Sequence, residues 1–215
     1  EIQRTVAAFL AEKMPVTGHG HAQTRTVPEI SDDLWAACCE LGWLGLGLPE
    51  SVGGVGYGLA EEAVVFRELG RGVAPGPFLS GVLAAHVAGA AGDTDLVQRI
   101  VTGEVRVAMA TATGAFEIGT TVSGHLSLVH SEKASLAVVV TPEGSALLNV
   151  ADMVVREVDP VDMSLSISEA TLSNSKAVHF VTGDSIYRRA LVLTSALSVG
   201  LALGVMHTAV EYSKV

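Results

Sequence analysis

The chain has 215 residues and a mass of 22.2 kDa, which is enough to bury a real core in one large or two small domains. Its formal net charge is −10 and its pI is about 5.1, so the sequence offers no basic run for a nucleic-acid backbone. Aromatic residues make up only 5%, so a core of small aliphatic side chains is expected.

Cysteine and histidine usage gives no sign of a disulfide or metal site. Cys38 and Cys39 are adjacent and lack a second pair, which predicts two small buried hydrophobes in a reducing compartment. His19 and His21 have no third ligand nearby and are interpreted as loop residues. No signal or transit peptide opens the sequence, so we expect a cytoplasmic protein, although Glu1 is not an initiator methionine.

The first hundred residues show helical periodicity interrupted by short breakers. Ser31, followed by Asp32 and Asp33, is a good amino-terminal cap for the second predicted helix. The predicted helices cover residues 2–13, 34–41, 59–69, 78–91 and a last segment that opens at Asp93 and stops at Gly103. His86 is the lone polar side chain on the fourth and is expected to be a satisfied core histidine. An all-α domain over residues 1–104 is therefore predicted.

Residues 46–77 combine a turn, a glycine-rich loop and an amphipathic helix. Several closely spaced glycines precede the helix that begins at Leu59. Glu61, Glu62 and Glu68 are interpreted as lying away from its apolar face. Acidic residues open this helix and basic ones close it, as the helix dipole favours.

Residues 105–183 change to short alternating segments separated by turn residues, at 105–111, 122–141, 153–158 and 165–172. This alternation predicts a middle domain made of an antiparallel sheet, as a small barrel or sandwich. From Asp184 the helical period returns, so residues 184–215 are predicted to begin a further helical domain. The predicted class is multidomain α+β.

Two segments resemble the flavin-dependent acyl-CoA dehydrogenases. LGLPESVGGVGYGLAEEAVVFRELGRGVAPGPF, from residue 46, is similar to that family's amino-terminal helical domain, and SVGLALGVMHTAVEYSKV (198–215) is similar to the first helix of its carboxy-terminal bundle. The resemblance implies FAD as cofactor, an acyl-CoA thioester as substrate and electron-transfer flavoprotein as acceptor. It also implies a homo- or hetero-oligomer with another subunit of this type.

The same resemblance assigns cofactor-binding residues, with departures. Thr111 occupies the threonine of a threonine-glutamate-proline step, but Ala112 and Thr113 replace the other two. In the element that packs against the flavin ring, Leu128 stands for the aromatic residue, with Val129 beside it and His130 in the hydroxyl position. His130 as a plain strand residue is an equal alternative. Further on, Asp162 and Ser164 keep a family step in which Leu165 replaces arginine.

No catalytic base can be named. Where a minority of the family carry a glutamate and arginine early in the last helix, this sequence has Ala190 and Leu191. Glu211 is interpreted as a surface residue with Lys214 as its i+3 partner. Arg188 and Arg189 could reach a CoA phosphate, but solvated charges at a helix start are favoured.

Two functional hypotheses follow. The first is a subunit of an acyl-CoA dehydrogenase, refined to the non-catalytic partner in a heteromeric enzyme of the kind found in bacteria that degrade steroid side chains. The second is a non-enzymatic scaffold. Residues 190–210 carry no formal charge and are long enough to span a membrane, but a central bundle helix explains them equally and is preferred.

Overall fold

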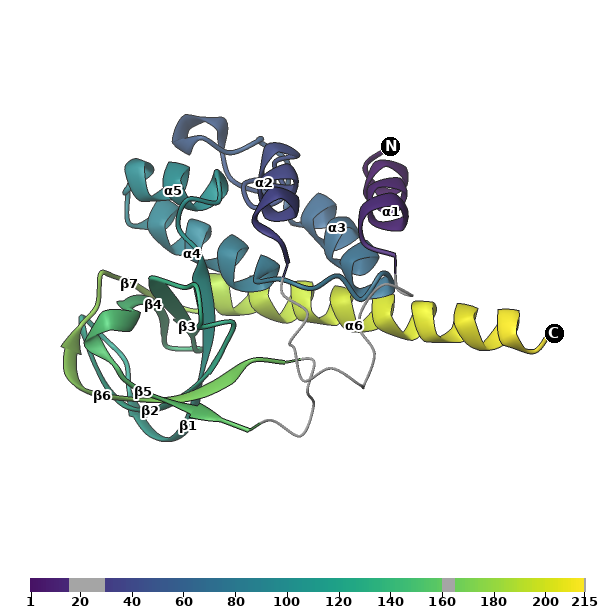
Figure 1. Ribbon diagram of the computed structural model, residues 1–215. Coiled ribbons are helices and arrows are strands. Elements are labelled where there is room, and N and C mark those ends of the chain that lie inside the picture. The colour runs from purple at the N-terminus through teal and green to yellow at the C-terminus, as the bar shows by residue number, and fades with distance from the viewer. Residues whose placement is uncertain (16–29, 160–164, 215) are drawn as a thin grey trace.

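The computed structural model describes residues 1–15, 30–159 and 165–214 (Figure 1). The amino-terminal helices lie together above a curled sheet and above one long helix, which runs from the sheet underneath the other helices and ends beyond them. The predicted order of helical part, sheet part and final helix is confirmed. His19, His21, Asp162 and Ser164 lie outside the described residues.

The helical part forms where the sequence period predicts it. Its elements are α1 (Ile2–Lys13), α2 (Asp32–Glu40), a short 3₁₀ turn (Glu50–Val52), α3 (Leu59–Arg71), α4 (Phe78–Ala90) and α5 (Thr94–Val101). The Ser31 side chain accepts from the Leu34 N–H at 3.3 Å, as the cap prediction requires. Asp93 does the same for α5, accepting from the Leu96 N–H at 3.0 Å.

The glycine-rich loop folds back on the segment before it and starts α3. Gly53 has φ +87°, and a side chain at Gly54 would collide with the backbone of Leu48. At the helix start, the Glu61 carboxylate accepts from the Gly58 N–H at 3.0 Å. The loop therefore fixes where α3 begins.

The sheet has seven strands in the order β5-β6-β2-β1-β3-β4-β7. They are β1 (Val107–Glu117), β2 (Thr121–Val129), β3 (Leu136–Val140), β4 (Gly144–Asn149), β5 (Val154–Val158), β6 (Ile167–Lys176) and β7 (His179–Thr182). The pairings are antiparallel except that β1 and β3 run parallel, so the sheet is mixed. The predicted middle sheet is confirmed, and it departs from the antiparallel pattern only at this pair, because β2 and β3 lie on opposite sides of β1.

The two faces of the sheet bury different cores. Ala108, Ala110, Leu126 and Leu128 belong to the core inside the curl, whereas Val107 and Val138 pack with α4 and α5 residues. The Ser80 hydroxyl of α4 donates to the Val107 carbonyl at 2.6 Å, which ties the helices to β1. Strand alternation therefore decides which β1 side chains face the helices.

Helix α6 (Ser185–Tyr212) packs along α3 at very short range. A side chain at Gly200 would overlap the Arg67 carbonyl, and one at Gly70 would overlap the Leu197 carbonyl. Small residues thus allow the two backbones to approach. Beyond Gly200 the helix is largely exposed, including Val205 and Met206, 62% and 59% exposed.

Candidate functional site

A strip of side chains on β1, β2, β6 and β5 continues the sheet face that the helices cover. Residues paired directly across antiparallel strands share a face, and the pairs form two rows. The row nearer the helices is Met109, Val129, Ile167 and Val158, and the next row is Thr111, Ser127, Glu169 and Arg156. All four residues of the first row are half-buried, whereas Thr111 and Glu169 are exposed.

The structure brings the four predicted cofactor residues close together but does not give them the same role. Thr111 and Val129 lie on the strip. Leu128 is 0% exposed and belongs to the core inside the curl, so it presents no surface to a bound ring. His130 follows β2 with φ +60°, and its backbone N–H donates to the Ser166 carbonyl at 3.3 Å. The assignment of these residues to a flavin stays a prediction.

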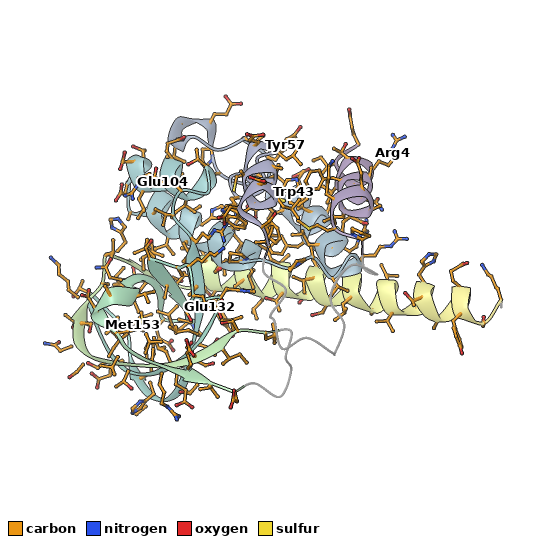
Figure 2. The ribbon with its side chains drawn as sticks, in the orientation of Figure 1. Arg4, Trp43, Tyr57, Glu104, Glu132 and Met153 are labelled. Carbon is orange, nitrogen blue, oxygen red and sulfur yellow. The ribbon has the colours of Figure 1, made fainter. Side chains whose placement is uncertain are left out.

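The turn after β2 is rich in hydroxyl groups. Ser131 and Ser168 place their hydroxyl oxygens 3.1 Å apart in a buried position, and the Ser166 hydroxyl donates to Glu132 at 2.7 Å. Figure 2 shows Glu132 where the sheet meets the helices. The turn holds the end of β2 against the start of β6, and this contact keeps the strip in place.

A second polar centre is buried between the helices. The Glu62 side chain of α3 is 1% exposed and accepts from the Gly47 N–H at 3.2 Å. Its carboxylate also lies 2.9 Å from His86 Nε2 on α4 and forms an ion pair with Arg189 on α6. This cluster joins α3, α4, α6 and the segment after α2. The prediction of His86 as a satisfied core histidine is confirmed.

The cluster keeps Glu62 ionised. Burial by itself raises the pKa of Glu62, but the hydrogen bond and charge of His86 and the charge of Arg189 outweigh it, so the pKa lies below its ordinary value. A side chain at Gly47 would collide with the Glu62 carboxylate and would have to displace it from its partners.

Two sequence interpretations fail at the cluster. Glu62 and Glu68 were placed away from the apolar face of α3, yet their side chains are 1% and 2% exposed. Arg189 was favoured as a solvated charge, but it pairs with buried Glu62. Arg188 is 74% exposed and pairs with Asp184 at 2.7 Å, as a solvated charge would. The spacing of Glu62, Phe66 and Leu69 could have revealed the first error, since i, i+4 and i+7 share one helix face.

Within the described residues, α6 carries no carboxylate near its start that could act as a catalytic base. Glu211 is the only acidic residue within α6, at its far end, where it pairs with Lys214 at 2.6 Å as predicted. No group of three potential metal ligands occurs among the described residues. Cys38 and Cys39 are buried, and burial raises their pKa values to about 12 and about 11, so neither is a nucleophile.

The strip fits one side of a planar ring rather than a whole cofactor. Half-buried Val129 and Ile167 can pack against a ring face, and the Thr111 and Ser127 hydroxyls can donate to its edge. The strip has no aromatic side chain for stacking. Its one cation, Arg156, is already engaged by Glu169 across the strands.

Comparison with known proteins identifies the helical part. Residues 1–106, about half of the chain, match the family model described as the acyl-CoA dehydrogenase N-terminal domain. Acyl-CoA dehydrogenase IpdE2 of Mycolicibacterium smegmatis is 25% identical over 215 residues, which cover 100% of this chain and 64% of the relative. The chain thus spans less than two thirds of that protein.

Solved structures share the fold over nearly the whole chain. The Tcur3481-Tcur3483 steroid ACAD superposes with a TM-score of 0.75 at 22% identity, covering 98% of this chain and 65% of that one. The ChsE4-ChsE5 complex from Mycobacterium tuberculosis gives 0.74 at 21% identity, covering 99% and 64%. At these identities the likeness establishes the fold alone.

Proposed function

We propose that this chain, whose residues 1–106 match the acyl-CoA dehydrogenase N-terminal family model, is the non-catalytic subunit of a heteromeric acyl-CoA dehydrogenase. In this proposal it forms one wall of the site, while another polypeptide supplies the base and most of the flavin contacts. The reaction is the α,β-dehydrogenation of an acyl-CoA thioester. Bound FAD would accept the β-hydride after a base removes the α-proton, leaving a trans-2-enoyl-CoA.

One observation carries the proposal: the strip can hold one side of a ring, but the described α6 brings no carboxylate to it. Thr111 and Val129 lie side by side with the hydroxyl of Ser127 and the apolar surface of Ile167. These residues can bind and orient a ring and exclude water from one side of it. We propose that a second chain supplies the base for proton abstraction.

The two structural neighbours support a heteromeric assembly, since one is named as a complex of two different proteins and the other joins two names. One of these neighbours is described as a steroid ACAD, so a bulky acyl-CoA is the proposed substrate class. Electron-transfer flavoprotein is the proposed electron acceptor.

The test is activity with and without a partner. The chain is purified alone and together with the polypeptide encoded beside it, and acyl-CoA-dependent reduction of an artificial acceptor is measured. We expect turnover only in the joint preparation, and loss of that turnover when a glutamate of the partner that faces the substrate is replaced. Full activity from this chain alone rules the proposal out.

The exposed surface of α6 favours a second candidate, a scaffold anchored to a membrane. α6 is the one helix in the described residues that is long and apolar enough to span a bilayer. Only 17% of its most apolar 18-residue stretch is buried. Partition of the chain into a detergent-free soluble fraction would exclude anchoring. Binding of flavin or acyl-CoA in any assembly would exclude a scaffold without ligands.

A further inference from the structure

The contacts of α6 along α3 define its axial position poorly. Residues 190–210 carry no formal charge, and the residues buried within α6 are Ile186, Leu193 and Gly200. The backbones of α3 and α6 meet at glycines, which have no side chain to interlock. Apolar and small-residue contacts of this kind are nearly repeated when a helix slides by one turn.

A slide of four residues toward the start of α6 keeps the packing along α3. At its start, Ala190 would take the place of buried Ile186 and the first turn would have to unwind, because only residues 183–184 separate α6 from β7. Leu197 would take the place of Leu193, and Gly204 the place of Gly200. At the carboxy-terminal end Thr208 would replace Gly204, where an added Cβ lies 2.5 Å from the Arg71 carbonyl. That obstacle is weak, because α6 is largely exposed beyond Gly200 and can bend away.

The Glu62–Arg189 pair does not survive the same slide. Leu193 would stand where Arg189 now meets Glu62. The carboxylate would remain buried opposite an apolar side chain, with His86 as its one remaining side-chain partner. A buried charge that loses its partner is strongly unfavourable, whereas an intact buried pair contributes little net stability. The pair therefore separates the two positions of α6 far more than it stabilises either one.

We propose that Glu62 is a positioning residue for α6, and that its buried ion pair with Arg189 fixes the register of α6 on α3. Gly47 and His86 hold the carboxylate at one place by their hydrogen bonds. The register decides which side chains of α6 lie against α3 and α4. This role is independent of flavin binding.

The test measures the position of α6 along its axis. Cysteines are introduced at Glu12 of α1 and Thr194 of α6, which are both exposed, and are labelled with nitroxides. Pulsed electron paramagnetic resonance then measures the distance between the two labels in the full chain. The variant E62Q/R189M keeps an acceptor for Gly47 and His86 but removes the charge pair. We expect a second population in this variant with a distance longer by up to about 6 Å, since four residues rise about 1.5 Å each.

Two control variants test whether any loss of an α6 ion pair, rather than loss of the buried charge, changes the measured distance. R188M removes the exposed neighbouring pair with Asp184, and R189K keeps the buried cation, so each should retain the single distance of the unmodified chain. Cys38 and Cys39 are buried, and the parent chain should take up no label. A single unchanged distance in folded E62Q/R189M overturns the proposal.

A further variant decides the matter if E62Q/R189M does not fold. T208G removes the steric obstacle at the far end of α6 and leaves the charge pair intact. The proposal requires one distance in T208G. A second population there would mean that side-chain sterics, rather than the pair, set the register.

Discussion

Replacing Arg189 by methionine tests the energetics of the buried cluster. Methionine preserves the length of the side chain but removes the Arg189 cation from Glu62, 1% exposed, and leaves His86 as its remaining side-chain partner. Removing one partner of a buried pair typically costs about 3–5 kcal/mol, whereas an exposed pair is worth about 0–1 kcal/mol. We therefore expect R189M to lower the free energy of unfolding by several times more than R188M, its neighbour on the same helix.

The free energy of unfolding of both variants is measured by urea denaturation, followed by far-ultraviolet circular dichroism. The double variant E62Q/R189M should recover much of the loss, because glutamine carries no charge and still accepts from Gly47 and His86. The non-additivity of the single variants reports the coupling of the pair.

The pH dependence gives a second measure of the same effect. The pKa of Glu62 is lowered in the folded chain, so its stabilising contribution is present above the unfolded pKa and is lost as the pH falls through the folded pKa. Without Arg189 one of the groups that lower this pKa is gone, and burial favours the protonated form. The stability difference between the parent chain and R189M should therefore shrink on acidification below the ordinary carboxylate range. Equal losses for R189M and R188M, or a difference that does not change with pH, would refute the reasoning.

Three other substitutions probe separate parts of the molecule. Gly200→Ala should destabilise the chain by about 1–3 kcal/mol in urea titrations, because its methyl group overlaps the Arg67 carbonyl; an unchanged midpoint would contradict the close contact of α3 and α6. Leu128→Ala should cost about 2–5 kcal/mol as a cavity in the core, and a variant as stable as the parent chain would show that Leu128 is not buried. Thr111→Val should leave stability within about 0.5 kcal/mol, since the site is exposed, but should weaken flavin binding in the reconstituted complex; equal binding would remove Thr111 from the site.

The local signals in the sequence predicted the helices well because caps and periodicity act over a few residues. Ser31 and Asp93 cap the helices they precede, and the apolar period locates α3 and α4. Strands β4 and β7 were not foreseen; at β4, Gly144 both closes a turn with Thr141 and begins the strand. The parallel pairing of β1 with β3 is set by long-range contacts that alternation does not encode.

The candidate site was predicted less well. Sequence could place Thr111 and Val129 on strands, but it could not show that their ladder neighbours Ser127 and Ile167 would complete the strip. Glu62 and Arg189 are 127 residues apart, and their meeting depends on the packing of α3 against α6. Charged residues are normally exposed, so burial of this pair was not expected from composition.

The central claim is that this chain holds one side of a flavin site and needs a second polypeptide to complete it. The visible absorbance spectrum of the chain purified alone and in its native complex tests this directly, because bound flavin absorbs where the polypeptide does not. We expect flavin bands in the complex and little or none in the chain alone. A stoichiometric flavin spectrum from the isolated chain, or a native complex without flavin, would contradict the account.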